Sequence, residues 1–142
     1  MTDTTIRRAT AQDGAACAGI IHAWLGGLDW MTQTPSHSDL VVALSEGLPM
    51  REAYVIGDPV QGYLSMEANI SHIWGLYTST QGQGLGKALM DRAKQGRNFV
   101  QLNTHVPNTR AHAFYEREGF VKVGDPWRGN DDVDEIRMEW RA

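Results

Sequence analysis

Short runs of alternating or continuous apolar residues recur along the chain and predict β-strands between segments of helical spacing. Strands are expected over residues 5–10, 51–58, 61–68, 71–78, 98–106, 120–124 and 134–140, and helices over residues 11–25, 35–47, 86–96 and 108–120. Helices and strands are mixed along the whole chain. This order predicts a fold of the α/β (α+β) class: a single domain over residues 1–142, built on a twisted mixed β-sheet of about seven strands with about four helices.

Two local features add detail to this pattern. Asp13 is the expected N-cap of the first helix. One face of that helix is expected to carry Ala15, Ala18, Ile21, His22 and Leu25. Gly75 interrupts the apolar segment 71–78. Because a glycine inside a strand often marks a bulge or a close backbone approach, an irregular strand is expected there.

Composition and charge narrow the classes of function. The formal net charge is −4 and there is no long Lys/Arg run, so nucleic acid is not an expected partner. No apolar run approaches the roughly 20 residues that span a bilayer, so no membrane partner is expected. Cys17 is the single cysteine and the first ten residues lack an apolar signal segment, which favours a cytoplasmic protein. The five histidines show no metal-binding spacing, so no metal is expected.

Residues 78–90 place three glycines between an apolar strand and a helix. These are Gly82, Gly84 and Gly86. Free N–H groups and the positive end of the helix dipole bind anions at such a point, and glycine lets a phosphate approach the backbone. A P-loop would need glycine in place of Gln81 and a hydroxyl residue in place of Ala88, and the GxGxxG spacing is also absent. A flexible turn without a ligand is the alternative.

The glycine loop and a later helix together resemble the GCN5-related N-acetyltransferase (GNAT) superfamily, in particular its small bacterial members. Gln81-x-x-Gly84-x-Gly86 resembles the family signature Q/R-x-x-G-x-G/A. The second segment that resembles the family is Asn108-x-x-Ala111-x-x-Phe114-Tyr115-x-x-x-Gly119-Phe120. The resemblance is clearest over residues 50–123 and implies acetyl-CoA as the donor substrate. It implies that the pyrophosphate of acetyl-CoA is held by Gln81, Gly82, Gln83, Gly84, Leu85, Gly86 and Lys87.

Two further expectations concern the cofactor. The resemblance implies that strands 71–78 and 98–106 are parallel and splay apart at their C-terminal ends. The pantetheine arm of acetyl-CoA would then bond to the open backbone of Leu76 and Thr78. For Lys87, a solvated side chain is as good an interpretation as a phosphate contact.

Helical geometry gives the second motif a physical interpretation. Because a helix turns by about 100° per residue, Asn108, Ala111 and Tyr115 share one face, and Phe114 faces the core. A small residue at Ala111 leaves room for the pantetheine arm, and Asn108 offers its amide to that arm besides capping the helix. Capping alone is the alternative for Asn108. Tyr115 is the expected acid that protonates the leaving thiolate, and a half-buried packing role is its alternative.

The base that removes a proton from an amine acceptor is harder to assign. Some family members carry a glutamate early in the strand that corresponds to 71–78. Here His72 stands in that neighbourhood and is the expected base, with Glu67 as the other candidate and a surface position as the alternative for the histidine. Candidate residues of the acceptor pocket are Trp30, His37 and Trp74. Core packing is the alternative for the tryptophans, and solvent exposure for His37.

These observations predict an acetyl-CoA-dependent N-acetyltransferase that transfers the acetyl group directly to an amine. The acceptor, a small molecule or a peptide, is not identified by the sequence, and a homodimer is left open. Two alternatives belong to other classes: a non-catalytic acyl-CoA-binding sensor module, and an acyltransferase with a different acyl donor or an O-acceptor.

Overall fold

The seven strands that the pattern predicts all form, and they lie in one sheet. A computed structural model describes residues 3–142. The sheet has the order β1-β2-β3-β4-β5-β7-β6. Its strands are β1 (Ile6–Arg8), β2 (Glu52–Ile56), β3 (Gly62–Glu67), β4 (His72–Thr78), β5 (Phe99–His105), β6 (Val121–Arg128) and β7 (Asp134–Arg141). Neighbouring strands are antiparallel except β4 and β5, which are parallel. The predicted mixed sheet is therefore confirmed.

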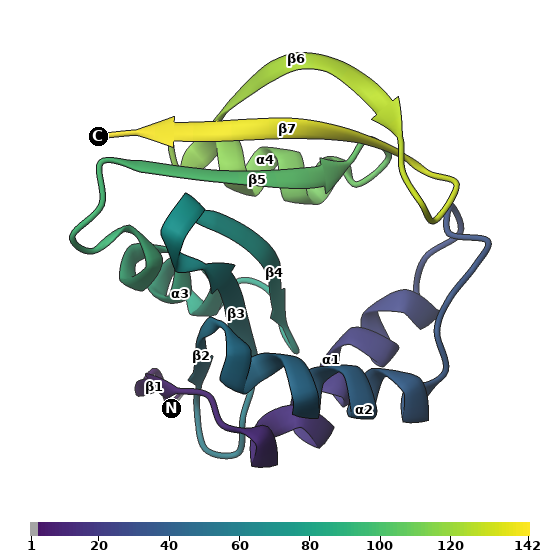
Figure 1. The fold of residues 1–142 in the computed structure, drawn as a ribbon, viewed down its shortest axis with the longest axis vertical. Coiled ribbons are helices and arrows are strands. Elements are labelled where there is room, and N and C mark those ends of the chain that lie inside the picture. The colour runs from purple at the N-terminus through teal and green to yellow at the C-terminus, as the bar shows by residue number, and fades with distance from the viewer. Residues whose placement is uncertain (1–2) are drawn as a thin grey trace.

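Four α-helices in the described part of the chain cover the two faces of this sheet. They are α1 (Gly14–Gly26), α2 (His37–Gly47), α3 (Leu85–Lys94) and α4 (Thr109–Arg117). Figure 1 shows α1 and α2 side by side, away from β5 to β7. One buried cluster joins α1 to β2 and β3, whereas a second and larger cluster joins α3 and α4 to the other face. The two helix pairs thus lie on opposite faces.

The two clusters are made of the apolar residues that the strand and helix patterns place inward. The α1 side includes Cys17, Ile21, Leu48, Val55 and Tyr63. The α3 and α4 side includes Leu64, Ile73, Leu89, Leu102, Tyr115, Phe120 and Met138. Cys17 is fully buried, and burial raises the pKa of its thiol to about 12, so it stays protonated and serves as a packing residue.

The first helix differs from its prediction. It begins at Gly14 after a short 3-10 turn, and its inward face is rotated, because Ala15 and His22 are exposed. Asp13 is the N-cap residue of α1, as expected, but its side chain makes no capping hydrogen bond to this helix. Its carboxylate instead binds the Arg7 guanidinium, with an N–O distance of 2.8 Å, and accepts a hydrogen bond from the backbone N–H of Thr10. The hydrogen bond from Arg7 holds the pKa of Asp13 below its ordinary value. A run of alanines does not define one helical face, and Asp13 has a stronger partner than the helix N-terminus.

The parallel strands β4 and β5 separate after two residue pairs. His72 lies opposite Gln101 and Ile73 opposite Leu102, and the strands are not paired beyond this point. On its other side, β4 continues to pair with β3 as far as Thr78, with a register shift that leaves Trp74 as the extra residue. The bulge therefore lies beside Gly75, and the expected gap between the two strands is present.

An ion pair between β2 and the segment after α3 gives a prediction on stability. The two terminal nitrogens of the Arg97 guanidinium, Nη2 and Nη1, donate to the carboxylate of Glu52 at 2.8 and 3.2 Å. This contact lowers the pKa of Glu52 below its ordinary value. Glu52→Gln is expected to reduce the free energy of unfolding by about 1 to 3 kcal/mol at pH 7, measured by urea denaturation.

The pH dependence of that loss follows from the direction of the shift. A carboxyl with a lowered pKa in the folded state stabilises the protein above its unfolded pKa, and this stabilisation is lost as pH falls through the folded pKa. The difference between Glu52→Gln and the unmodified protein should therefore shrink near pH 3. Exposed Glu46→Gln is the control and should change little at either pH. An equal loss at both pH values for Glu52→Gln would contradict the assignment.

Candidate functional site

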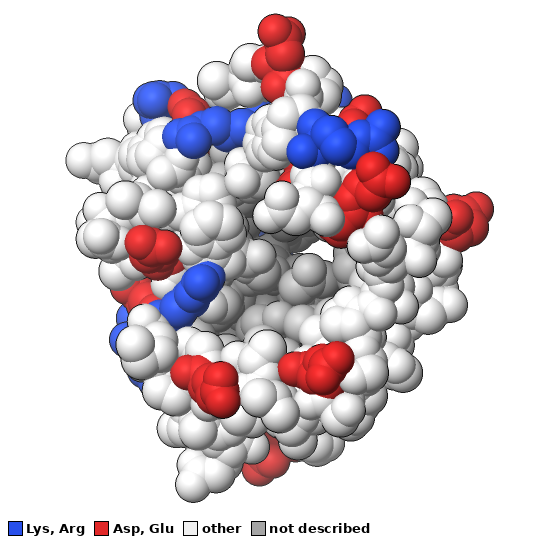
Figure 2. Space-filling model, turned by 45° about the vertical axis from the view of Figure 1, so that its right-hand side comes forward, with Lys and Arg blue, Asp and Glu red and all other residues white. Residues whose placement is uncertain are grey.

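The main pocket in the described part of the chain opens where β4 and β5 part. Its volume is about 410 Å³. Residues from β4, the loop that precedes α3, the end of β5 and α4 line it, together with Trp24 of α1. Figure 2 shows a hollow with mainly uncharged atoms inside and charged side chains along its rim. The pocket thus joins the glycine loop to the second motif, as the sequence leads one to expect.

The glycine loop has the backbone geometry of an anion site. Gly82 and Gly84 both have φ of +76°, a conformation that side chains other than glycine rarely adopt. Gly84 is the N-cap of α3, and no side chain caps this helix. Residues 81–84 are exposed and line the pocket. The first turn of α3 therefore presents its N-terminus to the pocket.

The remaining loop residues have more structural roles. A Cβ at Gly86 would lie 3.3 Å from the ring of Phe114, so this glycine lets α3 pack against α4. The Leu85 side chain is buried in the core, which leaves only its backbone for a ligand. Lys87 lies 3.4 Å from the Asp91 carboxylate and 3.6 Å from that of Glu118, although most of its side chain is exposed. Two carboxylates therefore share the lysine that was expected to be solvated or bound to phosphate.

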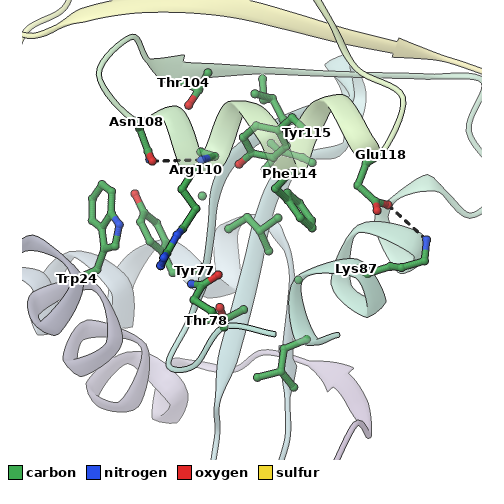
Figure 3. Close-up of a pocket in the computed structure, with 18 of the residues that line it drawn as sticks. Trp24, Tyr77, Thr78, Lys87, Thr104, Asn108, Arg110, Phe114, Tyr115 and Glu118 are labelled. Atoms are coloured by element: carbon green, nitrogen blue, oxygen red, sulfur yellow. Dashed lines mark hydrogen bonds and ion pairs between the residues drawn. The ribbon is translucent and has the colours of Figure 1, made fainter. Parts of the chain in front are cut away.

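The second motif lies across the pocket from β4. Asn108 caps α4, since its side-chain oxygen accepts a hydrogen bond from the backbone N–H of Ala111 at 3.2 Å. Asn108, Ala111 and Tyr115 all line the pocket, as their shared helical face predicts. Figure 3 shows Tyr115 and Phe114 extending from α4 into the space opposite Tyr77 and Trp24. The roles of Asn108 and Ala111 toward acetyl-CoA stay predictions.

Tyr115 has the environment of a phenol that keeps its proton. Burial raises the pKa of its hydroxyl well above the ordinary value, and the nearby Tyr77 raises it further. The hydroxyl has no hydrogen-bond partner among residues 3–142. A neutral hydroxyl without a protein acceptor is available to donate to a ligand in the pocket.

The structure does not bring His72 and Glu67 into this pocket. His72 is buried, its ring centroid lies 4.0 Å from that of Trp74, and within residues 3–142 its Nε2 has no hydrogen-bond partner. Burial, and after it the charge of Arg137, lowers the pKa of this imidazole. Glu67 accepts a hydrogen bond from Trp74 Nε1 at 3.1 Å. Of this group only Trp74 lines the pocket. The role of His72 or Glu67 as the base stays a prediction.

The other two candidate acceptor residues lie outside the main pocket. Trp30 lines a shallow second pocket, with its ring centroid 6.0 Å from that of Trp24 and 5.2 Å from that of His105. Trp30 therefore contacts two residues that line the main pocket without lining it itself. His37 is exposed on α2, where its ring contacts His22. Solvent exposure, the alternative for His37, describes it correctly.

Several residues that line the pocket were not predicted from the sequence. They are Trp24, Tyr77, Asn103, Thr104, His105, Arg110 and Glu135. For β5, the signal was available: alternate residues of a strand share one face, and Asn103 and His105 are polar and alternate. Glu135 lies directly opposite His105 in the antiparallel register of β5 and β7. That pairing depends on the sheet order, which local pattern does not give. Trp24 lies on α1. The packing of this helix against the sheet could not be predicted from local sequence pattern either.

Residues 3–142, which the structure describes, contain neither a cluster of metal-binding side chains nor a membrane-spanning helix. No group of three or more His, Cys, Asp or Glu side chains is arranged to hold a metal ion. No described helix has the length and apolar character needed to cross a membrane.

Comparisons with known proteins agree with this geometry. The family model for the acetyltransferase (GNAT) domain matches residues 36–122. Mycothiol acetyltransferase from Beutenbergia cavernae is 40% identical over 57 residues, which are 37% of this chain and 19% of that protein. The match to this relative thus spans less than a fifth of its length.

Solved structures show the same fold at low sequence identity. YjaB from Escherichia coli has a TM-score of 0.77 at 19% identity, with 96% of each chain covered. Ard1 from Thermoplasma volcanium has a TM-score of 0.75 at 21% identity, covering 99% of this chain and 98% of that one. The yncA protein of Salmonella typhimurium, solved with its cofactor acetyl-CoA, has a TM-score of 0.70 at 21% identity over 99% and 94% of the two chains.

Proposed function

Because the chain belongs to the acetyltransferase (GNAT) domain family, we propose that it transfers the acetyl group of acetyl-CoA to the nitrogen of an amine. The proposed acceptor is a small molecule or a peptide. The observation that carries the proposal is the pocket that runs from the glycine loop, through the gap between β4 and β5, to the hydroxyl of Tyr115. A donor with a phosphate at one end and a thioester at the other fits that layout.

Different groups of residues along the pocket suit different parts of acetyl-CoA. The loop at 81–87 would hold the pyrophosphate through backbone N–H groups at the start of α3. Beyond Ile73, β4 is no longer paired with β5. The backbone groups of Leu76 and Thr78 on this edge would therefore form hydrogen bonds with the pantetheine arm. The amide nitrogen of Asn108 would donate to the same arm, since its oxygen is already used as a cap.

Acetyl-CoA supplies the thioester, and this chain supplies the surroundings in which an amine attacks it. Tyr115 would donate its proton to the sulfur as the carbon–sulfur bond breaks. The raised pKa of its hydroxyl keeps that proton in place before the reaction. The apolar rings of Phe114 and Trp24 would limit water around the thioester.

The test is a thiol-release assay with the purified protein, acetyl-CoA and a panel of primary amines. The panel contains 2-phenylethylamine, putrescine, free amino acids and short peptides, and mass spectrometry identifies the product. We expect thiol release that depends on one class of amine, with an N-acetylated product. Matched alcohols replace the amines in one arm, and longer acyl-CoA donors replace acetyl-CoA in another.

The outcomes separate the proposal from its alternatives. An O-acetylated product, or faster turnover with a longer acyl donor, would transfer the assignment to another acyltransferase activity. Tight binding of acetyl-CoA in calorimetry without thiol release for any acceptor would identify a non-catalytic sensor. Either result would overturn the proposed N-acetyltransferase.

A further inference from the structure

His105 and Asp131 form a carboxylate–histidine pair at the acceptor end of the pocket. His105 is the last residue of β5, and Asp131 lies in the turn between β6 and β7. Nε2 of the imidazole lies 2.6 Å from Oδ2 of the carboxylate. The other ring nitrogen, Nδ1, has no hydrogen-bond partner among the described residues 3–142. A carboxylate on one nitrogen and no partner on the other is the arrangement of an oriented base.

The position of the ring in the sheet points it toward the face opposite α3 and α4. Leu102 and Thr104 are buried, and Leu102 belongs to the cluster beneath those helices. Because strand residues alternate between faces, His105 lies on the other face, as does Asn103. Both still line the pocket, since the gap between β4 and β5 opens it to both faces. An acceptor can therefore approach the thioester from the side that the donor does not occupy.

The surroundings of His105 suit an alkylammonium or arylalkylammonium ion. Three aromatic rings form a series that begins at His105. The ring centroids of His105 and Trp30 are 5.2 Å apart, those of Trp30 and Trp24 are 6.0 Å apart, and those of Trp24 and Tyr77 are 5.1 Å apart. Aromatic faces attract cations. Glu135 lines the pocket directly opposite His105 in the register of β5 and β7. Glu135 and the rings of Trp24 and Tyr77 therefore line the pocket with His105, while Trp30 and Asp131 contact the histidine without lining the pocket.

We propose that His105 is the general base for the acceptor, that Asp131 positions its imidazole, and that the acceptor is a primary ammonium ion. This inference rests on the proposed N-acetyltransferase function. His72, the base expected from the sequence, is buried outside the pocket, whereas His105 lies on its wall.

The proton and electron balance of the step is complete without another reactant. Nδ1 of His105 accepts one proton from the ammonium group, which leaves a neutral amine. The nitrogen lone pair forms a bond to the acetyl carbon, and the carbon–sulfur bond breaks. The second nitrogen proton is lost from the product, while Tyr115 gives its proton to the sulfur and is reprotonated from solvent. Amide, thiol and one released proton are the products.

Several titratable groups face His105 and enter its pH behaviour. Asp131 lies in the turn between β6 and β7, Glu135 on β7 and Tyr77 on β4. From α4, His112 places Nε2 2.9 Å from the carbonyl oxygen of His105. Burial raises the pKa of Glu135, and the charge of Asp131 adds to that direction while His105 opposes it. The field at this end of the pocket is therefore set mainly by two carboxyl groups.

The test compares pH–rate profiles of kcat/KM for His105→Gln and the unmodified protein, with acetyl-CoA and the fastest amine of the panel. Without a base, the enzyme depends on amine that is already neutral, and the rate rises about tenfold per pH unit. We expect a loss of at least about tenfold at pH 7, which narrows as pH approaches 10. The rate of the unmodified protein should rise less steeply with pH than that of His105→Gln, because its base accepts the proton from the ammonium group.

Two further variants make the readout specific. Asp131→Asn removes the carboxylate but keeps an acceptor oxygen, and should give a smaller loss in kcat/KM than His105→Gln, because the imidazole that accepts the proton is still present. The control is His22→Gln, a histidine exposed on α1, which should keep the profile of the unmodified protein. Acetyl-CoA affinity, measured by calorimetry, should stay unchanged in all three.

The outcomes keep this inference separate from the proposed function. No turnover of any amine by the unmodified protein defeats the proposed function itself. Turnover with an unchanged profile in His105→Gln overturns the inference alone, and loss of the profile in His72→Gln instead would make His72 the base. Nitrogen-15 NMR of the histidine rings adds a test without an acceptor. We expect the proton of neutral His105 on Nε2, and a proton on Nδ1 would overturn the assignment.

Discussion

Replacing Tyr115 by phenylalanine should lower turnover about 10²- to 10⁴-fold while acetyl-CoA affinity changes little. The substitution keeps the ring and removes only the hydroxyl. Thiolate is then released without a positioned proton donor, and this cost appears in the transition state alone. Steady-state kinetics give the turnover number, and calorimetry with acetyl-CoA gives the affinity.

The structure makes this variant a clean probe. Since the Tyr115 hydroxyl has no hydrogen-bond partner among residues 3–142, its removal should leave the fold intact. The raised pKa of the phenol also gives a sign for pH dependence. A phenol is protonated below its pKa, so the unmodified enzyme should show no loss of activity up to about pH 10 from this group.

Two other tyrosines serve as comparisons. Tyr54→Phe removes a hydroxyl that donates to Glu52 outside the pocket, and should keep full turnover. Tyr77→Phe removes the other phenol of the pocket. If Tyr77→Phe loses turnover and Tyr115→Phe does not, the acid is Tyr77. If Tyr115→Phe loses affinity and keeps turnover, its hydroxyl only binds the donor.

The sheet could be predicted because its strands are marked by apolar runs and bounded by turn residues. The parting of β4 and β5 also came from the sequence, through the family resemblance and Gly75. The bulge itself lies at Trp74, one residue away. The prediction of the inward face of α1 was wrong. Hydrophobic periodicity does not distinguish Ala15 from Ala18, although only Ala18 is buried.

The two motifs that line one part of the pocket could be predicted from the sequence, whereas the residues at its other end could not. Two local motifs were available, and each lies within one short segment of the sequence: Gln81 to Lys87, and Asn108 to Tyr115. The other end of the pocket, where we propose that the acceptor binds, is lined by Trp24, His105 and Glu135, which come from α1, β5 and β7. Only the sheet order, with β7 between β5 and β6, brings the last two together. His72, at the start of β4, was the candidate base that the sequence offered, and the fold buries it outside the pocket.

Gly84→Val should weaken acetyl-CoA binding at least tenfold, about 1.4 kcal/mol, and the reason is both steric and conformational. Gly84 has φ of +76° at the start of α3, where a branched side chain is strained by about 1 to 2 kcal/mol. In the protein itself, a Cβ at this position would meet no atom within 4 Å. Because Gly84 lines the pocket, the added side chain would occupy space in which we propose that the pyrophosphate binds. Calorimetric titration of acetyl-CoA into the variant measures the loss.

Gly96 provides a matched control at the other end of the same helix. It has φ of +73°, and a Cβ there would also meet no atom within 4 Å. Unlike Gly84, it does not line the pocket. Gly96→Val should therefore lose a similar amount of stability in urea denaturation and keep its affinity for acetyl-CoA. If both variants bind acetyl-CoA equally well while both remain folded, the loop at 81–87 is not the phosphate site. If both lose affinity to the same extent, the effect comes from α3 as a whole rather than from its N-terminus.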